Sequence, residues 1–92
     1  MADISITQPH ALSLIEAREA AQRVADKLAE EFSLSSNWDQ DVLRFQRAGV
    51  SGMLVLRATE AQLELELGMM LKGFASMIEE KLVRKMKTAF AG

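Results

Sequence analysis

The sequence contains no cysteine and no tyrosine, and it has a single proline, a single tryptophan and a single histidine. Without cysteine the chain forms neither disulfides nor thiolate metal sites, which excludes a disulfide-stapled secreted domain. No apolar run approaches the roughly 20 residues that a membrane-spanning helix needs. The start of the chain lacks the basic residues and apolar core of a signal peptide, so we expect a cytoplasmic protein with no transmembrane segment.

The net charge of the chain is also small. The 11 basic and 13 acidic residues leave a formal net charge of −2, so the molecule as a whole has no electrostatic reason to bind nucleic acid. The hydrophobic fraction is 49% of 92 residues, which predicts one domain over residues 1–92. A domain this small is modestly stable, and a partner chain would add to its stability.

Two helices are predicted from apolar residues at helical spacing. Ser13 and Glu16 form a capping box that opens an amphipathic helix over Leu14–Phe32. A second helix is predicted over Met69–Phe90, after Gly68 ends the preceding strand. Its expected buried stripe consists of Leu71, Phe74, Ile78, Leu82, Met86 and Ala89 or Phe90, widened by Met70 and Met77.

Strands are predicted where apolar and polar residues alternate. The first is Asp3–Thr7, closed by Pro9 because proline cannot donate to a sheet ladder. Polar Ser33–Asn37 is expected to break the first helix, after which Trp38 begins or ends a short strand and residues 39–41 turn. The three clearest strands are Val42–Arg47, Met53–Ala58 and Gln62–Leu67.

The hairpin between the first two of these strands is predicted to turn through Gly49 and Val50. That loop would place Phe45 opposite Leu54 and Leu43 opposite Leu56, with all four side chains on the apolar face.

The element order β-α-β-β-β-β-α therefore predicts an α+β fold, an antiparallel meander sheet with two helices packed on one face. The opposite face is mixed, and Arg44 and Glu64 are expected to support the register across the central strand. Val42, Met53 and Val55 form an apolar patch on this face, of the kind that marks an interface between chains.

No catalytic, cofactor-binding or metal-binding constellation is visible, so we expect no enzyme, no cofactor and no metal site. His10 lacks an orienting partner, and we expect it to cap or hydrogen-bond at the corner between strand and helix. Glu64 and Glu66 share one face of a strand, but that face is predicted to be solvated. Residues 49–52, Gly-Val-Ser-Gly, lack the lysine and the strand–loop–helix context of a phosphate loop, which favours a hairpin turn.

The end of the second helix is basic, through Lys81, Arg84, Lys85 and Lys87. Cations near a helix C-terminus compensate the helix dipole, and this structural interpretation is preferred. The alternative is docking on an anionic surface, with methionine and phenylalanine side chains entering the apolar phase beneath.

Three segments resemble the polyhydroxyalkanoic acid system proteins, small bacterial proteins encoded beside genes for storage-polyester synthesis and use. The opening resembles the family in Ala2-Asp3-Ile4-Ser5-Ile6, Pro9-His10, Leu12-Ser13-Leu14 and Glu16-Ala17-Arg18. The centre resembles it in Asp41-Val42-Leu43-Arg44-Phe45, Arg47, Gly49-Val50-Ser51-Gly52 and Leu54, and a third segment in residues 64–68. The resemblance carries no catalytic residues over to this chain. The predicted compact domain differs from the long amphipathic helices of simple granule-coat proteins, which leaves a regulatory or adaptor role open.

Three functions follow as hypotheses. The first is a non-enzymatic accessory or granule-associated protein of polyhydroxyalkanoate metabolism, acting through the granule surface or granule proteins. The second is a small hydrophobic-ligand-binding module of helix-grip type, although a filled core is expected in 92 residues. The third is a homodimeric interaction module built on the patch of the outer sheet face.

Overall fold

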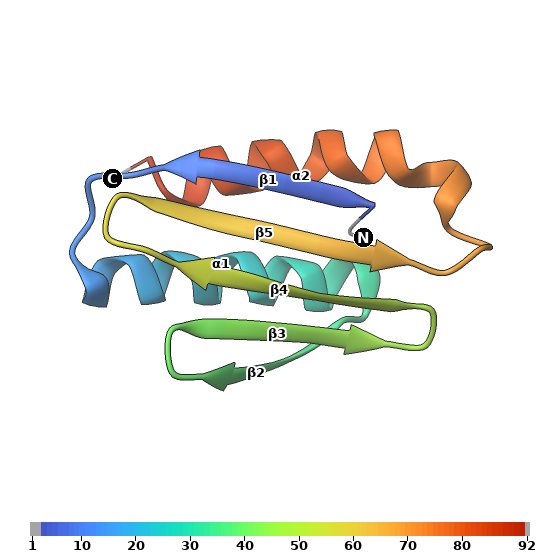
Figure 1. The fold of residues 1–92 in the computed structure, drawn as a ribbon, viewed down its shortest axis with the longest axis horizontal. Helices are drawn as coiled ribbons and strands as arrows, with labels where there is room; N and C mark the ends of the chain where they lie inside the picture. Colours follow the sequence, from blue (N-terminus) through green and yellow to red (C-terminus); the bar gives the residue numbers. More distant parts are fainter. Residues whose placement is uncertain (1–2, 92) are drawn as a thin grey trace.

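The computed structural model describes residues 3–91, so Ala2 of the opening segment lies outside the described residues. Five strands and two α-helices follow in the predicted order, which confirms the α+β fold (Figure 1). Their bounds are β1 Ile4–Pro9, α1 Leu14–Phe32, β2 Ser35–Asp39, β3 Val42–Arg47, β4 Val50–Leu56, β5 Glu60–Leu67, the short 3₁₀ helix η1 Lys72–Phe74, and α2 Ala75–Ala89.

The strands form one antiparallel sheet in the order β1-β5-β4-β3-β2, and both helices lie on the same face of it (Figure 1). The N-terminal strand β1 thus pairs with β5, which makes β5 an interior strand. Pro9 is the last residue of β1, opposite Glu60, rather than a residue beyond the strand as predicted. Proline is tolerated there because β1 is an edge strand.

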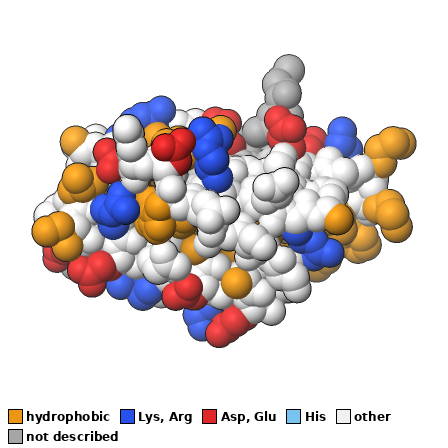
Figure 2. Space-filling view, turned by 90° about the horizontal axis from the view of Figure 1, so that it is seen from below, with side chains coloured by type: hydrophobic (Ala, Val, Ile, Leu, Met, Phe, Trp, Pro, Cys, Tyr) orange, Lys and Arg blue, Asp and Glu red, His pale blue; other side chains and the backbone are white. Residues whose placement is uncertain are grey.

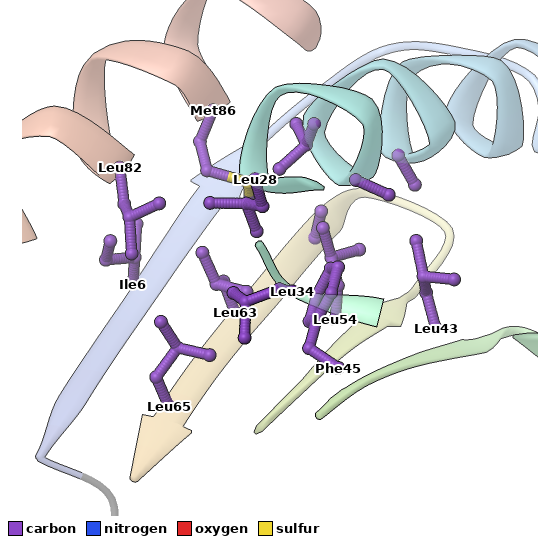
Figure 3. Close-up of a cluster of buried hydrophobic side chains, with 14 of the residues drawn as sticks. Ile6, Leu28, Leu34, Leu43, Phe45, Leu54, Leu63, Leu65, Leu82 and Met86 are labelled. Carbon is purple, nitrogen blue, oxygen red and sulfur yellow. The ribbon is translucent and has the colours of Figure 1, made fainter. Parts of the chain in front are cut away.

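The core fills the layer between the sheet and the helices. Leu43, Leu54 and Leu63 from three adjacent strands are fully buried, as are Leu28 of α1 and Leu82 of α2 (Figure 3). The sheet side of α1 is mostly alanine, which lets the helix backbone approach the strands closely. No buried side-chain nitrogen or oxygen in residues 3–91 lacks a hydrogen-bond partner.

The predicted register of the β3–β4 hairpin was wrong by two residues. Arg47 pairs with Val50 around a loop of Ala48 and Gly49, so that Leu43 lies opposite Leu54 and Phe45 opposite Gly52. The left-handed conformation (φ +82°) belongs to Gly49 as the second loop residue, not the first. A slip of two residues keeps every side chain on its predicted face, because the alternation has a period of two.

The break after α1 is shorter than predicted. Ser33 caps the helix in the left-handed region (φ 56°), and β2 already begins at Ser35. Trp38 therefore lies inside a strand, where its Nε1 donates to Gln22 Oε1 of α1 at 2.9 Å. The Arg18 guanidinium lies 4.1 Å from the Trp38 ring centroid, so Trp38 itself makes two contacts with α1.

The start of α1 is the predicted capping box. The Ser13 backbone N–H donates to Glu16 Oε1 at 3.1 Å, and the Glu16 N–H donates to Ser13 Oγ at 3.2 Å. The hydrogen bond from the Ser13 backbone, aided by one from the Ser13 side chain, lowers the pKa of the Glu16 carboxyl from its ordinary value of 4.5. The carboxylate is thus the form that the folded protein prefers.

This capping box predicts a pH dependence of stability. A folded-state pKa below the unfolded value contributes stability above pH 4.5, and this contribution disappears as the pH falls through the folded pKa. We expect Glu16→Gln to be less stable than wild type at pH 7, with the difference shrinking as the pH falls below 4.5. Urea unfolding between pH 7 and pH 3 measures this, with Glu19→Gln as the matched control for removal of one exposed charge of α1. A difference that stays constant across this range would contradict the prediction.

Candidate functional site

The connection between β5 and α2 forms an irregular end of the molecule. Gly68 N donates to Gly49 O at 2.6 Å, and Gly68 O accepts from the N–H groups of Leu71 and Lys72 at 2.9 and 3.1 Å. These bonds turn the chain tightly, so α2 begins at Ala75 and the helix predicted to start at Met69 was too long. A side chain at Gly68 would approach within 3.1 Å of Gly49 O, so the close contact favours glycine.

This connection and the first turn of α2 expose four large apolar side chains, which we call the apolar tip: Met69, Met70, Phe74 and Met77. Met69 and Met70 are 92% and 91% exposed, and Phe74 and Met77 are 52% and 51% exposed. Three of them, Met70, Phe74 and Met77, were predicted to belong to the buried stripe of α2, and that prediction was wrong. Met70 and Phe74 precede α2, so they do not follow the helical path that would point them at the sheet, and Met77 lies in the first turn of α2 on a side that is half-exposed. Figure 2 shows hydrophobic side chains gathered at this end of the molecule.

An apolar cavity of about 210 Å³ lies behind the apolar tip. It lies between the end of α1, the strand ends at this side of the sheet, and the start of α2. Its lining is Leu28, Phe32, Leu34, Arg47, Val50, Leu65, Leu67, Leu71, Phe74, Met77, Ile78 and Leu82. The expected filled core thus holds over most of the sheet and fails at this end.

A basic groove of about 670 Å³ runs between α1 and α2. It brings the predicted residues Lys81, Arg84 and Lys85 together with Arg23 and Lys27 of α1. The predicted residue Lys87 does not line it and lies in the last turn of α2, where compensation of the helix dipole accounts for its charge. Arg23 and Lys27 were missed because they are more than 50 residues away in sequence, although their spacing of four places them on one face of α1.

The basic groove contains one acidic side chain, Glu31. Lys85 Nζ lies 2.9 Å from Glu31 Oε1, and this hydrogen bond lowers the pKa of Glu31. Lys27 and Arg84 make longer ion pairs within their own helices, at 3.9 Å to Glu30 and 3.8 Å to Glu80. Such exposed pairs contribute little to stability, so these cations remain accessible to an anionic partner.

The outer face of the sheet holds the third predicted group. Val42 and Val55 lie directly opposite each other on β3 and β4, and Met53 lies between Arg44 and Glu64. All three apolar side chains are half-buried. The homodimer that this patch suggested stays a prediction, which light scattering after size-exclusion chromatography would test.

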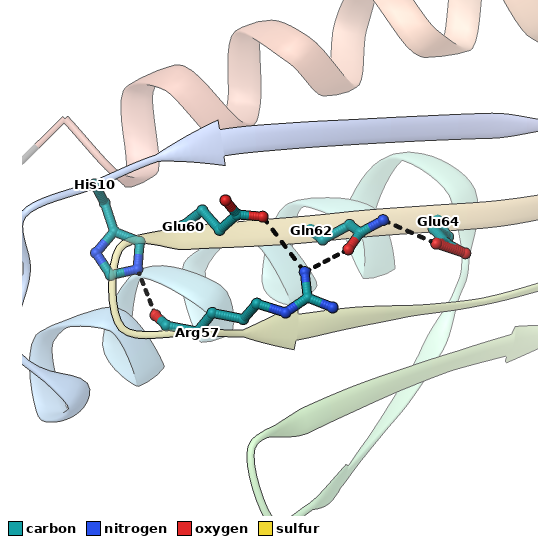
Figure 4. Close-up of polar contacts among 5 residues, drawn as sticks. All are labelled: His10, Arg57, Glu60, Gln62 and Glu64. Carbon is teal, nitrogen blue, oxygen red and sulfur yellow. Dashed lines mark hydrogen bonds and ion pairs between the residues drawn. The ribbon is translucent and has the colours of Figure 1, made fainter.

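The polar residues of the same face pair differently from the prediction. Arg44 Nε lies 3.7 Å from Asp39 Oδ2, so it pairs with the edge strand rather than with Glu64 across β4. Glu64 Oε1 accepts instead from Gln62 Nε2 at 3.0 Å, and Gln62 Oε1 accepts from Arg57 at 2.5 Å (Figure 4). Glu64 thus finds its partner on its own strand, and Arg44 finds its partner on the adjacent strand β2, nearer than a residue two strands away.

His10 hydrogen-bonds at the strand-to-helix corner, as predicted. Its Nδ1 accepts from the Leu12 N–H at 3.1 Å, and its Nε2 donates to the Arg57 carbonyl at 3.1 Å (Figure 4). The ring centroid also lies 5.5 Å from that of Phe90, just beyond α2. Both ring nitrogens are thus engaged by backbone groups.

A model of the family described as “putative polyhydroxyalkanoic acid system protein” matches residues 4–90. The chain belongs to this family. The match confirms the resemblance of the three sequence segments and extends it across both helices and the whole sheet. No curated protein and no solved structure matches the chain.

No helix within residues 3–91 combines the length and the apolar character that crossing a bilayer requires. The same residues contain no group of three or more histidine, aspartate or glutamate side chains placed to hold a metal ion.

Proposed function

We propose that this protein is a non-enzymatic accessory protein of polyhydroxyalkanoate metabolism that acts by contact with the granule surface or with proteins on it. Membership of the family supports the metabolic context. The observation that carries the mode of action is the apolar tip, where two methionines are exposed almost completely. Large apolar side chains grouped on a surface mark interaction sites, and methionine adapts to irregular apolar partners.

The basic groove supports the same mode of action. The groove adjoins the cavity behind the apolar tip, since Phe32 lines both. An apolar patch next to a cationic surface suits the boundary between an apolar phase and an anionic layer.

The environment of the single histidine supports a non-enzymatic role. A general base must have a ring nitrogen available to take a proton, but both nitrogens of His10 are engaged by Leu12 and Arg57.

Granule pelleting tests the proposal. Purified protein is mixed with isolated polyhydroxyalkanoate granules and centrifuged, and the double variant Met69→Ser/Met70→Ser is compared with wild type. We expect at least a tenfold weaker association of the variant, because fully burying one methionine side chain is worth about 1.5–3 kcal/mol, and about 1.4 kcal/mol is tenfold in affinity.

The chain offers a matched control at its other end. Leu14 and Ile15 are also exposed, at 54% and 73%, but lie at the start of α1. Leu14→Ser/Ile15→Ser should pellet like wild type. Protease-treated granules separate the two forms of contact, since binding lost on treatment indicates a granule protein. Wild-type protein that stays in the supernatant with both granule preparations would overturn the proposal.

A further inference from the structure

The cavity behind the apolar tip has room for a small apolar molecule. Its volume is about 210 Å³, and its walls are leucine, valine, isoleucine, methionine and phenylalanine side chains, with one charged lining residue. Because an apolar cavity of about 150 Å³ holds one benzene molecule, this one admits a chain of about six to eight carbon atoms. Phe74 and Met77, which line it, are half-exposed, so the cavity is reachable from the tip.

The charged lining residue is Arg47, at the end of β3. Its Nη1 donates to the Phe32 carbonyl at 2.6 Å, which holds the guanidinium at the cavity rim where α1 ends. Within residues 3–91 no carboxylate forms an ion pair with it. A guanidinium offers five N–H donors in a planar fork that matches a carboxylate.

Lys81 adds positive charge near the same rim. It lies one helical turn after Met77 and Ile78 of the cavity wall, and it lines the adjoining basic groove. The two sites share Phe32 as a common wall. The cavity is therefore apolar inside and cationic at its opening, which is the charge pattern of a receptor for an anionic amphiphile.

We propose that this cavity binds one medium-chain aliphatic carboxylate, with its chain among the apolar side chains and its carboxylate on Arg47. Hydroxyalkanoic acids of six to eight carbons belong to this chemical class, and their choice as the natural members rests on the proposed function. The cavity and the charge at its rim do not depend on any contact with granules.

Titration of the full-length protein with octanoate tests the proposal. Binding is measured by calorimetry and by NMR shifts of the methyl groups of the lining residues. The comparison ligands are 1-octanol, which keeps the chain without the charge, and butyrate, which keeps the charge on a short chain. We expect one octanoate per chain, bound at least tenfold more tightly than either comparison ligand. Equal binding of octanoate and 1-octanol, or shifts confined to residues outside the cavity, would overturn the proposal without any variant.

Variants then locate the site. Ile78→Phe fills the cavity and should weaken octanoate binding at least tenfold. Arg47→Gln should reduce octanoate binding to the level of 1-octanol while leaving 1-octanol binding unchanged. Lys87→Gln removes a charge from α2 outside the groove and should bind octanoate like wild type. Octanoate binding unaffected by both Ile78→Phe and Arg47→Gln, with folding verified by circular dichroism, would refute the assignment.

The ligand site and the granule contact fail separately. Octanoate binding by a protein that never pellets with granules overturns the proposed function and retains the ligand site. If wild type does not bind octanoate but Ile78→Phe still pellets with granules, the ligand site is overturned and the proposed function is retained.

Discussion

Gly52→Ala is expected to destabilise the protein by about 3 kcal/mol, the upper end of the usual cost of overpacking a core. A Cβ atom at this position would lie 2.3 Å from Glu64 O and 2.3 Å from Leu65 Cδ2. The first of these atoms belongs to the backbone of the neighbouring strand, so a rotamer change cannot relieve the clash. Gly52 lies in β4, the middle strand of five, and β4 would have to separate from β5 to admit the methyl group.

Urea unfolding followed by Trp38 fluorescence and circular dichroism measures the effect. Gly73→Ala is the matched control, because a Cβ there meets no atom within 4 Å. Alanine has the higher helix propensity by about 1 kcal/mol, so this control should be as stable as wild type or slightly more stable. A Gly52→Ala protein within about 0.5 kcal/mol of wild type, the range of neutral surface changes, would show that the strands are less tightly packed than described.

Leu82→Ala is expected to cost about 3 kcal/mol, because truncating a fully buried leucine loses transfer free energy and leaves a void. Leu82 has no exposed surface, and it lies beside Ile6 of β1 beneath α2 (Figure 3). Only Leu82 and Met86 are fully buried among the residues of α2, so each carries a large share of the docking of this helix. Loss of this contact should loosen α2 before it affects the strands.

Hydrogen exchange and chemical unfolding together test this prediction. Amides of α2 should exchange faster in Leu82→Ala, and the free energy of unfolding should fall. Leu14→Ala is the control, since Leu14 is half-exposed at the start of α1, and such changes are usually within about 0.5 kcal/mol of wild type. Unchanged protection of α2 in the Leu82 variant would mean that the helix is held by contacts other than its buried side chains.

Patterns of neighbouring residues predicted which faces of the strands are buried and where several helices and strands begin and end. Ser13 and Glu16 predicted the start of α1 to the residue, since a capping box is a local hydrogen-bonding arrangement. Alternation in residues 42–47 predicted both the bounds of β3 and its buried side chains. The family resemblance also lay in the sequence, because it depends on residue identity in short segments.

The candidate site was predicted only in part. Lys81, Arg84 and Lys85 could be found on the sequence of α2, but Arg23 and Lys27 join them through the packing of two helices that are distant in sequence. The exposure of the apolar tip could not be predicted, because the spacing of Met70, Phe74 and Met77 also fits a buried helical stripe. The cavity depends on α1, α2, η1 and the strands β3, β4 and β5, which meet only in the folded chain.

By itself the sequence determined which side of each strand and of α1 is apolar, because these periods depend only on residues close together in the chain. Tertiary structure alone decided the pairing of β1 with β5, the two-residue shift of the β3–β4 hairpin, and the start of α2 at Ala75. Several arrangements satisfy the same local pattern. The choice among them rests on long-range contacts such as Gly52 against Leu65 and Gly68 against Gly49.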